Sequence, residues 1–211
     1  MTGSRPAGMP IGPAHLDALV ETLTTCGPEL SQTAQRWGRE LADRLSRGHR
    51  LLVGGNGGSA AQAQHLTAEL VGRYRDDRAP LSALALHAET STLTAVLNDY
   101  GADEVYARQV AAHGRPGDVL VLLSTSGRSP NVLRAAHAGR AAGLTVWAMT
   151  GRAPNPLTVL AHDALVVDGP STATVQEVHL VGLHLVCAAL DVALGVCPQA
   201  LAAPSAPGGT R

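Results

Sequence analysis

The residues best suited to proton chemistry follow a glycine-rich stretch in the first third of the chain. His65 and Glu69 are four positions apart, so they share one face if their segment is helical. An imidazole beside a carboxylate can exchange protons with a substrate. The common alternative is a pair that is satisfied within its own helix. Their place just after the glycine-rich stretch favours an enzyme for a phosphorylated metabolite.

The glycine-rich stretch itself, Leu51 to Ser59, predicts an anion site. Three apolar residues typical of a buried strand come first, four glycines and Asn56 follow, and helix-forming residues begin at Ser59. A strand, such a turn and a helix start expose free backbone N–H groups and the positive end of the helix dipole. Ser59 is placed to cap the helix or to contact a phosphate oxygen.

Other interpretations of this turn compete with the anion site. Gly55-x-Gly57-x-x-Ala60 fits the dinucleotide fingerprint with alanine in the last place. That fingerprint needs an acidic residue about 20 positions further on, whereas the nearest candidate, Glu89, lies 34 residues after Gly55. A Walker A loop is excluded because no Gly-Lys-Ser/Thr follows. A purely structural tight turn remains open, and neither this turn nor the next predicts a nucleotide cofactor.

A second polar loop, Ser124 to Ser129, has four hydroxyl side chains in six residues. It lies between an apolar run and the expected start of a helix. Hydroxyl and backbone N–H groups suit a tetrahedral phosphate and need no metal ion. A capped helix with surplus serines is the alternative, and the presence of the first loop favours phosphate.

The last apolar helix contains a row of polar residues. Gln176 and His184 are eight positions apart, about two helical turns, so they are nearly eclipsed. Glu177 and His179 lie to either side of that line. A lone histidine in an apolar helix is usually a core residue with a partner. Two histidines with a glutamine are harder to explain as core residues, because each buried polar group costs free energy unless it is paired.

The elements that must position these residues alternate between strands and helices. Continuous apolar runs separated by helical patterns predict a parallel sheet with helices on both faces, an α/β doubly wound sandwich of flavodoxin-like type. The five expected strands are 51–53, 82–86, 119–123, 145–149 and 164–167. Ligands of such folds bind at the carboxyl ends of the strands, where both polar loops lie.

The helical segments and the ends of the chain complete this plan. We expect a helix over 15–47, broken at Gly27-Pro28, in which Trp37, Leu41 and Leu45 face the core. A turn over 98–101 precedes a helix over 103–113 that Asp103 caps. The shorter and later helices are expected over 88–98, 130–142, 155–161 and 175–195. Residues 14–197 form one domain, and composition predicts disorder in 1–13 and 198–211.

Composition narrows the function classes. A net charge of −1 gives no electrostatic case for nucleic acid or an anionic membrane. Three cysteines without metal-ligand spacing favour a reduced, cytoplasmic location. Residues 178–196 are apolar enough to raise the question of a membrane helix, but they include His179, His184 and Asp191, which are costly in lipid. A buried or interface helix is the better interpretation.

Five motifs in order resemble the sugar isomerase (SIS) family, closest to its phosphoheptose isomerases. They are Gly54-Gly-Asn-Gly-Gly-Ser59, Ala68-Glu-Leu-x-Gly-Arg-Tyr74, Asn98-Asp, Ser124-Thr-Ser-Gly-x-Ser129, and Gln176-Glu-x-His179 through His184. The resemblance covers about residues 15–195. Two positions depart from the family pattern: Arg128 stands where an asparagine is common, and Ala173-Thr-Val replaces a stretch that contains an aspartate and an arginine.

The resemblance implies roles for individual residues. Glu69 and His184 would be the acid–base pair. The residues that would contact the phosphosugar are Asn56, Gly57, Ser59, Asn98, Asp99, Ser124, Thr125, Ser126, Ser129 and Gln176. Those that match zinc-binding positions of some members are His65, Glu69, Gln176 and His184. Members are typically homotetramers with sites at subunit interfaces, which would explain the apolar last helix.

The implied reaction is aldose–ketose isomerisation of sedoheptulose 7-phosphate to D-glycero-D-manno-heptose 7-phosphate. It moves a proton between adjacent carbons through a cis-enediolate, which needs a base at carbon and a group that shuttles protons between two oxygens. Glu69 suits the first role and His184 the second. If zinc is bound, it could hold both oxygens and act as a Lewis acid. Two alternatives stay open: a related ketose phosphate such as an octulose 8-phosphate, and a non-catalytic phosphosugar- or initiator-binding protein.

Overall fold

One parallel sheet of five strands lies at the centre of the computed structural model, which describes residues 12–196. The strands are β1 (Leu51–Gly55), β2 (Ala83–Ala85), β3 (Val119–Ser124), β4 (Thr145–Thr150) and β5 (Asp163–Val166). Their order, β2-β1-β3-β4-β5, makes β1 and β3 neighbours, with Gly55 paired to Leu123 where both strands end. The predicted α/β fold is therefore confirmed, and the two polar loops leave the sheet side by side.

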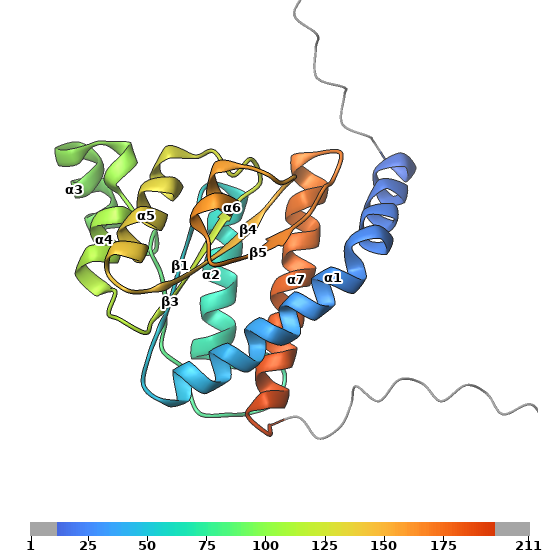
Figure 1. Ribbon diagram of the computed structural model, residues 1–211, viewed down its shortest axis with the longest axis horizontal. Helices are drawn as coiled ribbons and strands as arrows, with labels where there is room; N and C mark the ends of the chain where they lie inside the picture. The colour runs from blue at the N-terminus through green and yellow to red at the C-terminus, as the bar shows by residue number, and fades with distance from the viewer. Residues whose placement is uncertain (1–11, 197–211) are drawn as a thin grey trace, which may run out of the picture.

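Helices cover the sheet in two layers (Figure 1). The α-helices of the described range are α1 (Pro13–Ser46), α2 (Gly58–Val71), α3 (Thr90–Tyr100), α4 (Ala107–His113), α5 (Pro130–Ala141), α6 (Pro156–Leu160) and α7 (Thr172–Ala193). One core cluster joins α1, α2 and α7 to one sheet face, and a second joins α3 to α6 to the other. Neighbouring strand residues alternate between them: Leu51 and Val53 belong to the first cluster and Leu52 to the second.

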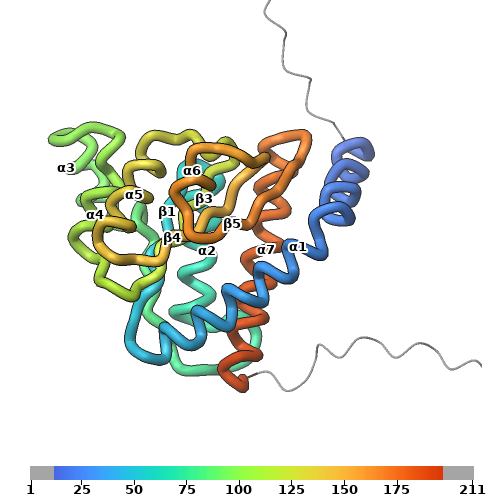
Figure 2. The backbone as a smooth tube through the Cα atoms, viewed as in Figure 1, coloured from blue at the N-terminus to red at the C-terminus, as the bar shows by residue number. Residues whose placement is uncertain are grey.

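The first helix runs unbroken through Pro28, so the predicted break at Gly27-Pro28 is wrong. Apolar residues on both sides of the proline, such as Leu23 and Leu30, pack against the same core, and this packing outweighs the local cost of proline. The axis of α1 bends along its length, a common effect of an internal proline (Figure 2). Trp37 is buried and stacks on Trp147 of β4, as the core prediction required.

Helices α1 and α7 approach each other very closely. A Cβ atom added at Gly38 of α1 would lie 2.5 Å from the side chain of Ala189 and 2.7 Å from the backbone nitrogen of Leu190. Only glycine fits there, so the two backbones touch. This contact fixes α7, the helix that carries Gln176 and His184, against the rest of the molecule.

Two local predictions between β2 and β3 are wrong. Residues 98–100 form the last turn of α3 instead of a turn, and the helix ends at Gly101, which has a positive φ of 86°. The predicted helix over 103–113 is split into a 3₁₀ turn, Ala102–Glu104, and α4. The split follows from Tyr106, because its buried ring turns inward and its hydroxyl donates to the carbonyl of Gly55.

The last helix begins at Thr172, earlier than predicted, because the Ser171 hydroxyl caps it by accepting from the Thr174 amide. By length and composition α7 could cross a membrane, but half of its most apolar window is buried in the protein. A core helix passes the same test. The disorder predicted for 1–11 and 198–211 lies outside the described residues, whereas Gly12 and Pro13, also predicted to be disordered, form the start of α1.

Candidate functional site

A cavity of about 240 Å³ lies where three helices begin at the carboxyl edge of the sheet. Its walls include the first residues of α2, the Ser129 cap of α5 and Thr172 at the start of α7. The full lining is Asn56, Gly57, Gly58, Ser59, Leu123, Ser124, Thr125, Ser126, Ser129, Thr172 and Gln176. None of these side chains carries a formal charge.

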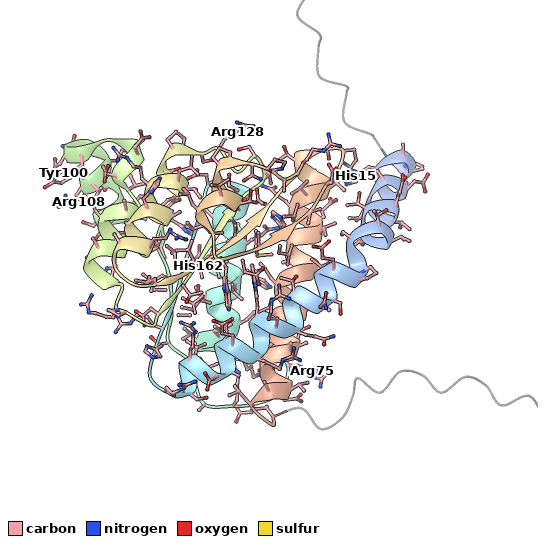
Figure 3. All side chains as sticks on the ribbon, viewed as in Figure 1. His15, Arg75, Tyr100, Arg108, Arg128 and His162 are labelled. Atoms are coloured by element: carbon pink, nitrogen blue, oxygen red, sulfur yellow. The ribbon has the colours of Figure 1, made fainter. Side chains whose placement is uncertain are left out.

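The construction of this cavity favours an anion. Helix N-termini have backbone N–H groups without helical partners and the positive end of the dipole, so three of them together favour negative charge. The hydroxyls of Ser124 and Ser129 lie 3.2 Å apart, and the Arg128 amide donates to the Ser126 hydroxyl. Arg128 itself points outward from the edge of the molecule, so it leaves the cavity without a cationic side chain (Figure 3).

The structure gathers most of the predicted phosphosugar residues around this cavity. They are Asn56, Gly57, Ser59, Ser124, Thr125, Ser126, Ser129 and Gln176. Gly58, Leu123 and Thr172 line it too and were missed. Thr172 could have been found from the Ser171-Thr172 start signal, which the later predicted start of the helix passed over. The two polar loops of the sequence thus form one site.

A side-chain clasp joins the two loops of the cavity. The amides of Asn56 and Asn131 donate to each other over two bonds of 2.9 Å. The Tyr106 hydroxyl also reaches the Asn56 side chain, at 3.2 Å, and burial raises the pKa of this tyrosine. No local pattern indicates Asn131 or Tyr106, because their contacts link segments 50 or more residues apart.

A buried histidine supports the second loop from behind. His179 is fully buried, and its Nε2 lies 3.2 Å from the carbonyl of Thr150, so that nitrogen is the donor. The Thr150 hydroxyl in turn donates to the Ser124 carbonyl at 2.8 Å. Burial lowers the pKa of His179 to about 4, and its Nδ1 has no partner among the described residues. His179 is therefore a neutral core residue and outside the cavity.

Further along α2 and α7, the side chains of His65, Glu69 and His184 form a cluster. His65 Nε2 lies 3.0 Å from His184 Nε2 and 3.4 Å from a carboxylate oxygen of Glu69. The ring of Tyr74 lies beside His184, with 5.8 Å between ring centroids. One possible ligand atom from each of the three side chains lies within 4.8 Å of the other two. The predicted acid–base residues Glu69 and His184 therefore meet, and His65 contacts His184 across 119 residues of sequence.

The donors of this cluster fit a metal ion. Two imidazoles and one carboxylate make a three-ligand set typical of catalytic zinc, which keeps a fourth position open. Gln176, the other predicted ligand, lies elsewhere: a Cβ at Gly58 would be 2.6 Å from its amide oxygen. It lies beside the anion cavity, about two helical turns from His184. The structure thus brings three of the four predicted ligands together.

Asn98 and Asp99 lie neither at the anion cavity nor at the His65, Glu69 and His184 cluster. Both are exposed at the end of α3, where the Asn98 amide donates to the Asp99 carboxylate. Their neighbour Tyr100 lies under Arg108 at the end of the molecule away from α7 (Figure 3). Glu89, the acidic residue weighed for a dinucleotide site, caps α3 by accepting from the Ser91 and Thr92 amides. Its pKa is lowered by a hydrogen bond from the Thr92 side chain and by these two amides.

Comparisons with known proteins agree with this geometry. The SIS domain family matches residues 14–151. The phosphoheptose isomerase of Streptomyces coelicolor is 68% identical over 164 residues, which cover 78% of this chain and 71% of the relative. The enzyme of the same name from Rhodospirillum rubrum is 46% identical over 172 residues, covering 82% and 89%.

Solved structures give the same result. The phosphoheptose isomerase of Neisseria gonorrhoeae aligns with a TM-score of 0.78 and 39% identity, covering 85% of this chain and 96% of the other. The phosphoheptose isomerase of Francisella tularensis aligns with a TM-score of 0.75 and 34% identity, covering 84% and 92%. The chain therefore belongs to the SIS domain family and, within it, to the phosphoheptose isomerases, a group of aldose–ketose isomerases.

Proposed function

We propose that this protein interconverts sedoheptulose 7-phosphate and D-glycero-D-manno-heptose 7-phosphate. The observation that carries the proposal is that the anion cavity and the His65, Glu69 and His184 cluster lie along the same two helices, α2 and α7. A ligand bound by its phosphate at the helix starts would extend toward the acid–base residues. The names of the similar proteins support a seven-carbon sugar phosphate as that ligand.

In the proposed reaction Glu69 takes the proton from the carbon beside the carbonyl and returns it to the neighbouring carbon. His184 moves a proton between the two oxygens, which yields the enediolate and then the product. The cavity residues hold the phosphate and fix the distance of the sugar from Glu69. Hydroxyls and backbone amides bind the phosphate at all stages, so this interaction serves binding more than the chemical step.

His65, Glu69 and His184 would hold a zinc ion in this site. Zinc supplies Lewis-acid stabilisation of negative charge on oxygen when it is bound. Glu69 has two carboxylate oxygens, so one can be a ligand while the other faces the substrate. Gln176 is proposed as a contact of the substrate from its place beside Gly58, and as a ligand only if the substrate-bound form draws it toward the cluster.

We also propose a cytoplasmic homotetramer. Its support is an exposed apolar row on α7, comprising Val181, Leu185 and Val192, and the separation of Asn98 and Asp99 from the cavity of their own chain. Sites completed at subunit interfaces would give these two residues a substrate to contact. Cys26 and Cys187 are free thiols, as expected in a reducing compartment. Light scattering on the purified protein measures the assembly.

The experiment that tests the function is an NMR assay of sedoheptulose 7-phosphate in D₂O. We expect deuterium incorporation at the carbon beside the carbonyl and formation of the heptose 7-phosphate. A chelator should abolish both, and added Zn²⁺ should restore them. A full rate after complete metal removal would refute the zinc proposal alone. Turnover only with an eight-carbon homologue would replace the substrate, and no exchange with either sugar would favour the non-catalytic alternative.

A further inference from the structure

A buried arginine outside the predicted site holds the helix turn that contains Glu69. Arg78 lies in the loop after α2, yet its side chain is only 3% exposed. One terminal nitrogen donates to the Glu69 carbonyl at 2.6 Å, and the other donates to the Leu70 carbonyl at 2.8 Å. The last carbonyls of a helix have no partner within it, and α2 has no basic residue in its own last turn. Arg78 supplies both the donors and the positive charge.

The same side chain reaches across to α7. Its Nε donates to the Asp191 carboxylate at 3.0 Å, and the Asp191 side chain is also 3% exposed. Asp191 lies seven residues after His184, two helical turns, so both are on the same face of α7. Cys187 lies between them on that face and is buried. Arg78 therefore ties the Glu69 turn of α2 to the His184 face of α7.

Stability alone does not explain this arrangement. A buried ion pair costs desolvation, and well-packed apolar residues of similar size often replace one without loss of stability. Here the second oxygen of Asp191 has no partner among the described residues, which makes the pair less favourable still. What apolar residues could not reproduce is the three-way geometry, in which one planar guanidinium is bonded to two carbonyls of α2 and one carboxylate of α7.

We propose that Arg78, oriented by Asp191, is a positioning residue for the acid–base pair of Glu69 and His184. It sets the separation of α2 and α7 at which His65 of α2 lies 3.0 Å from His184 of α7. The role in catalysis rests on the proposed function. The anion cavity lies at the other end of α2, so Arg78 governs the chemical step and the metal cluster and leaves phosphate binding unaffected.

The first test substitutes Arg78 and measures the two kinetic constants separately. Arg78→Lys keeps the charge but loses the planar fork, and Arg78→Met loses both. We expect kcat to fall 10- to 100-fold, more in Arg78→Met, with KM within about twofold, as for other residues that orient ligands and catalytic groups. The control is Arg134→Met, which removes an exposed ion pair with Glu104 on the opposite layer and should change neither constant. An unchanged kcat in a folded Arg78→Met variant would overturn the proposal.

A paired variant separates positioning from stability. Arg78→Met with Asp191→Leu replaces the whole ion pair by apolar side chains, so we expect a higher melting temperature than in either single variant. The kcat should nevertheless stay low, because the carbonyls of Glu69 and Leu70 have lost their donor. Recovery of kcat together with stability would mean that the pair only holds the fold. If Arg78→Met does not fold, the paired variant and Arg78→Lys give the answer.

A cobalt titration tests the positioning role of Arg78 independently of the proposed function. Co²⁺ reports its coordination by visible absorption, so its affinity for the cluster can be measured without any sugar. We expect the dissociation constant to rise 10- to 100-fold in Arg78→Met and to stay unchanged in Arg134→Met. If the wild-type protein does not convert the sugar, the proposed function fails while the cobalt result still decides on Arg78. Equal cobalt affinity in both variants would overturn the positioning role.

Discussion

The anion cavity and the His65, Glu69 and His184 cluster share two helices but are built in different ways. The cavity uses backbone amides and short hydroxyl side chains at helix starts, and no charged side chain lines it. The cluster uses imidazole and carboxylate side chains further along the same helices, between the middle and the end of α2 and in the middle of α7. Gly58 and His65 are seven residues apart, about 10 Å along α2. One region can bind a dianion and the other can move protons, without direct interference between them.

This separation suits a substrate whose phosphate and reacting carbons are at opposite ends. A cationic side chain in the cavity would bind phosphate more tightly but would also alter the charge balance near the acid–base residues. The construction from dipoles avoids that effect. Changes to the cluster should therefore alter turnover, and changes to the cavity should alter binding.

The largest expected effect is at the cluster. Glu69→Gln keeps the shape of the side chain but removes the proposed base, so kcat should fall by about 10²- to 10⁴-fold. KM and the assembly state should be unchanged, because the phosphate contacts lie elsewhere. Gln64→Ala, on an exposed position of the same helix, is the control. Steady-state kinetics measures both, and near-normal turnover in Glu69→Gln would remove Glu69 as the base.

The next effect concerns how the stability of the protein depends on pH through His179, which lies behind the cavity. Burial lowers the pKa of His179 to about 4 from an unfolded value of 6.5, so below pH 6.5 the unfolded chain takes up a proton that the folded chain does not. The free energy of unfolding should therefore decrease as the pH falls, by about 2 kcal/mol from this residue at pH 5. Urea unfolding at pH 7 and pH 5 measures it.

A His179→Gln variant isolates this contribution. Glutamine can still donate to the Thr150 carbonyl but does not titrate, so the stability difference between the two pH values should shrink by about the same 2 kcal/mol. An identical pH dependence in both proteins would show that His179 is protonated in the fold. As the pH falls, phosphate binding should weaken before the protein unfolds, because the Thr150 hydroxyl bonds to the Ser124 carbonyl of the cavity.

A cavity hydroxyl should affect binding alone. Ser126→Ala removes one donor to a charged phosphate, so KM should rise about tenfold with kcat within twofold. Ser46→Ala, at the exposed end of α1, is the control. A KM that does not change would place the phosphate away from the second loop. A decrease in kcat equal to the increase in KM would break the division between the two regions.

The smallest effect is expected at the clasp between the loops. Tyr106→Phe removes the hydroxyl that donates to the Gly55 carbonyl and reaches Asn56. The free energy of unfolding should decrease by about 1 kcal/mol, with a severalfold rise in KM. Thermal unfolding and kinetics measure the two. A lower kcat at unchanged KM would instead connect the clasp to the cluster.

The two regions also differ in how far the sequence predicts them. The cavity follows from local patterns, because a strand, a glycine or serine loop and a helix start are contiguous in the chain. The cluster depends on the packing of α2 against α7, which brings residues 119 positions apart into contact. Local patterns contain no such information, and the resemblance to a family supplied Glu69 and His184 as a pair.

The errors have the same origin. Pro28 was expected to end a helix, but the packing of α1 on the core decided otherwise. Tyr106 splits a predicted helix because its hydroxyl reaches Gly55, 51 residues earlier. Arg78 gave no signal at all, since an arginine in a polar loop is ordinarily exposed. In each case a long-range contact overrode a correct local tendency.

The close contact of Gly38 with Ala189 and Leu190 has a consequence for synthesis of the protein. Among the described elements, α1 leaves the ribosome before all others, and α7, which packs on it, leaves after them. Until α7 is complete, the apolar stripe of α1 has no helix to pack against and is open to aggregation or to a chaperone. The central strands and helices can pair earlier, so we expect α1 to become fully protected only after α7 has left the ribosome.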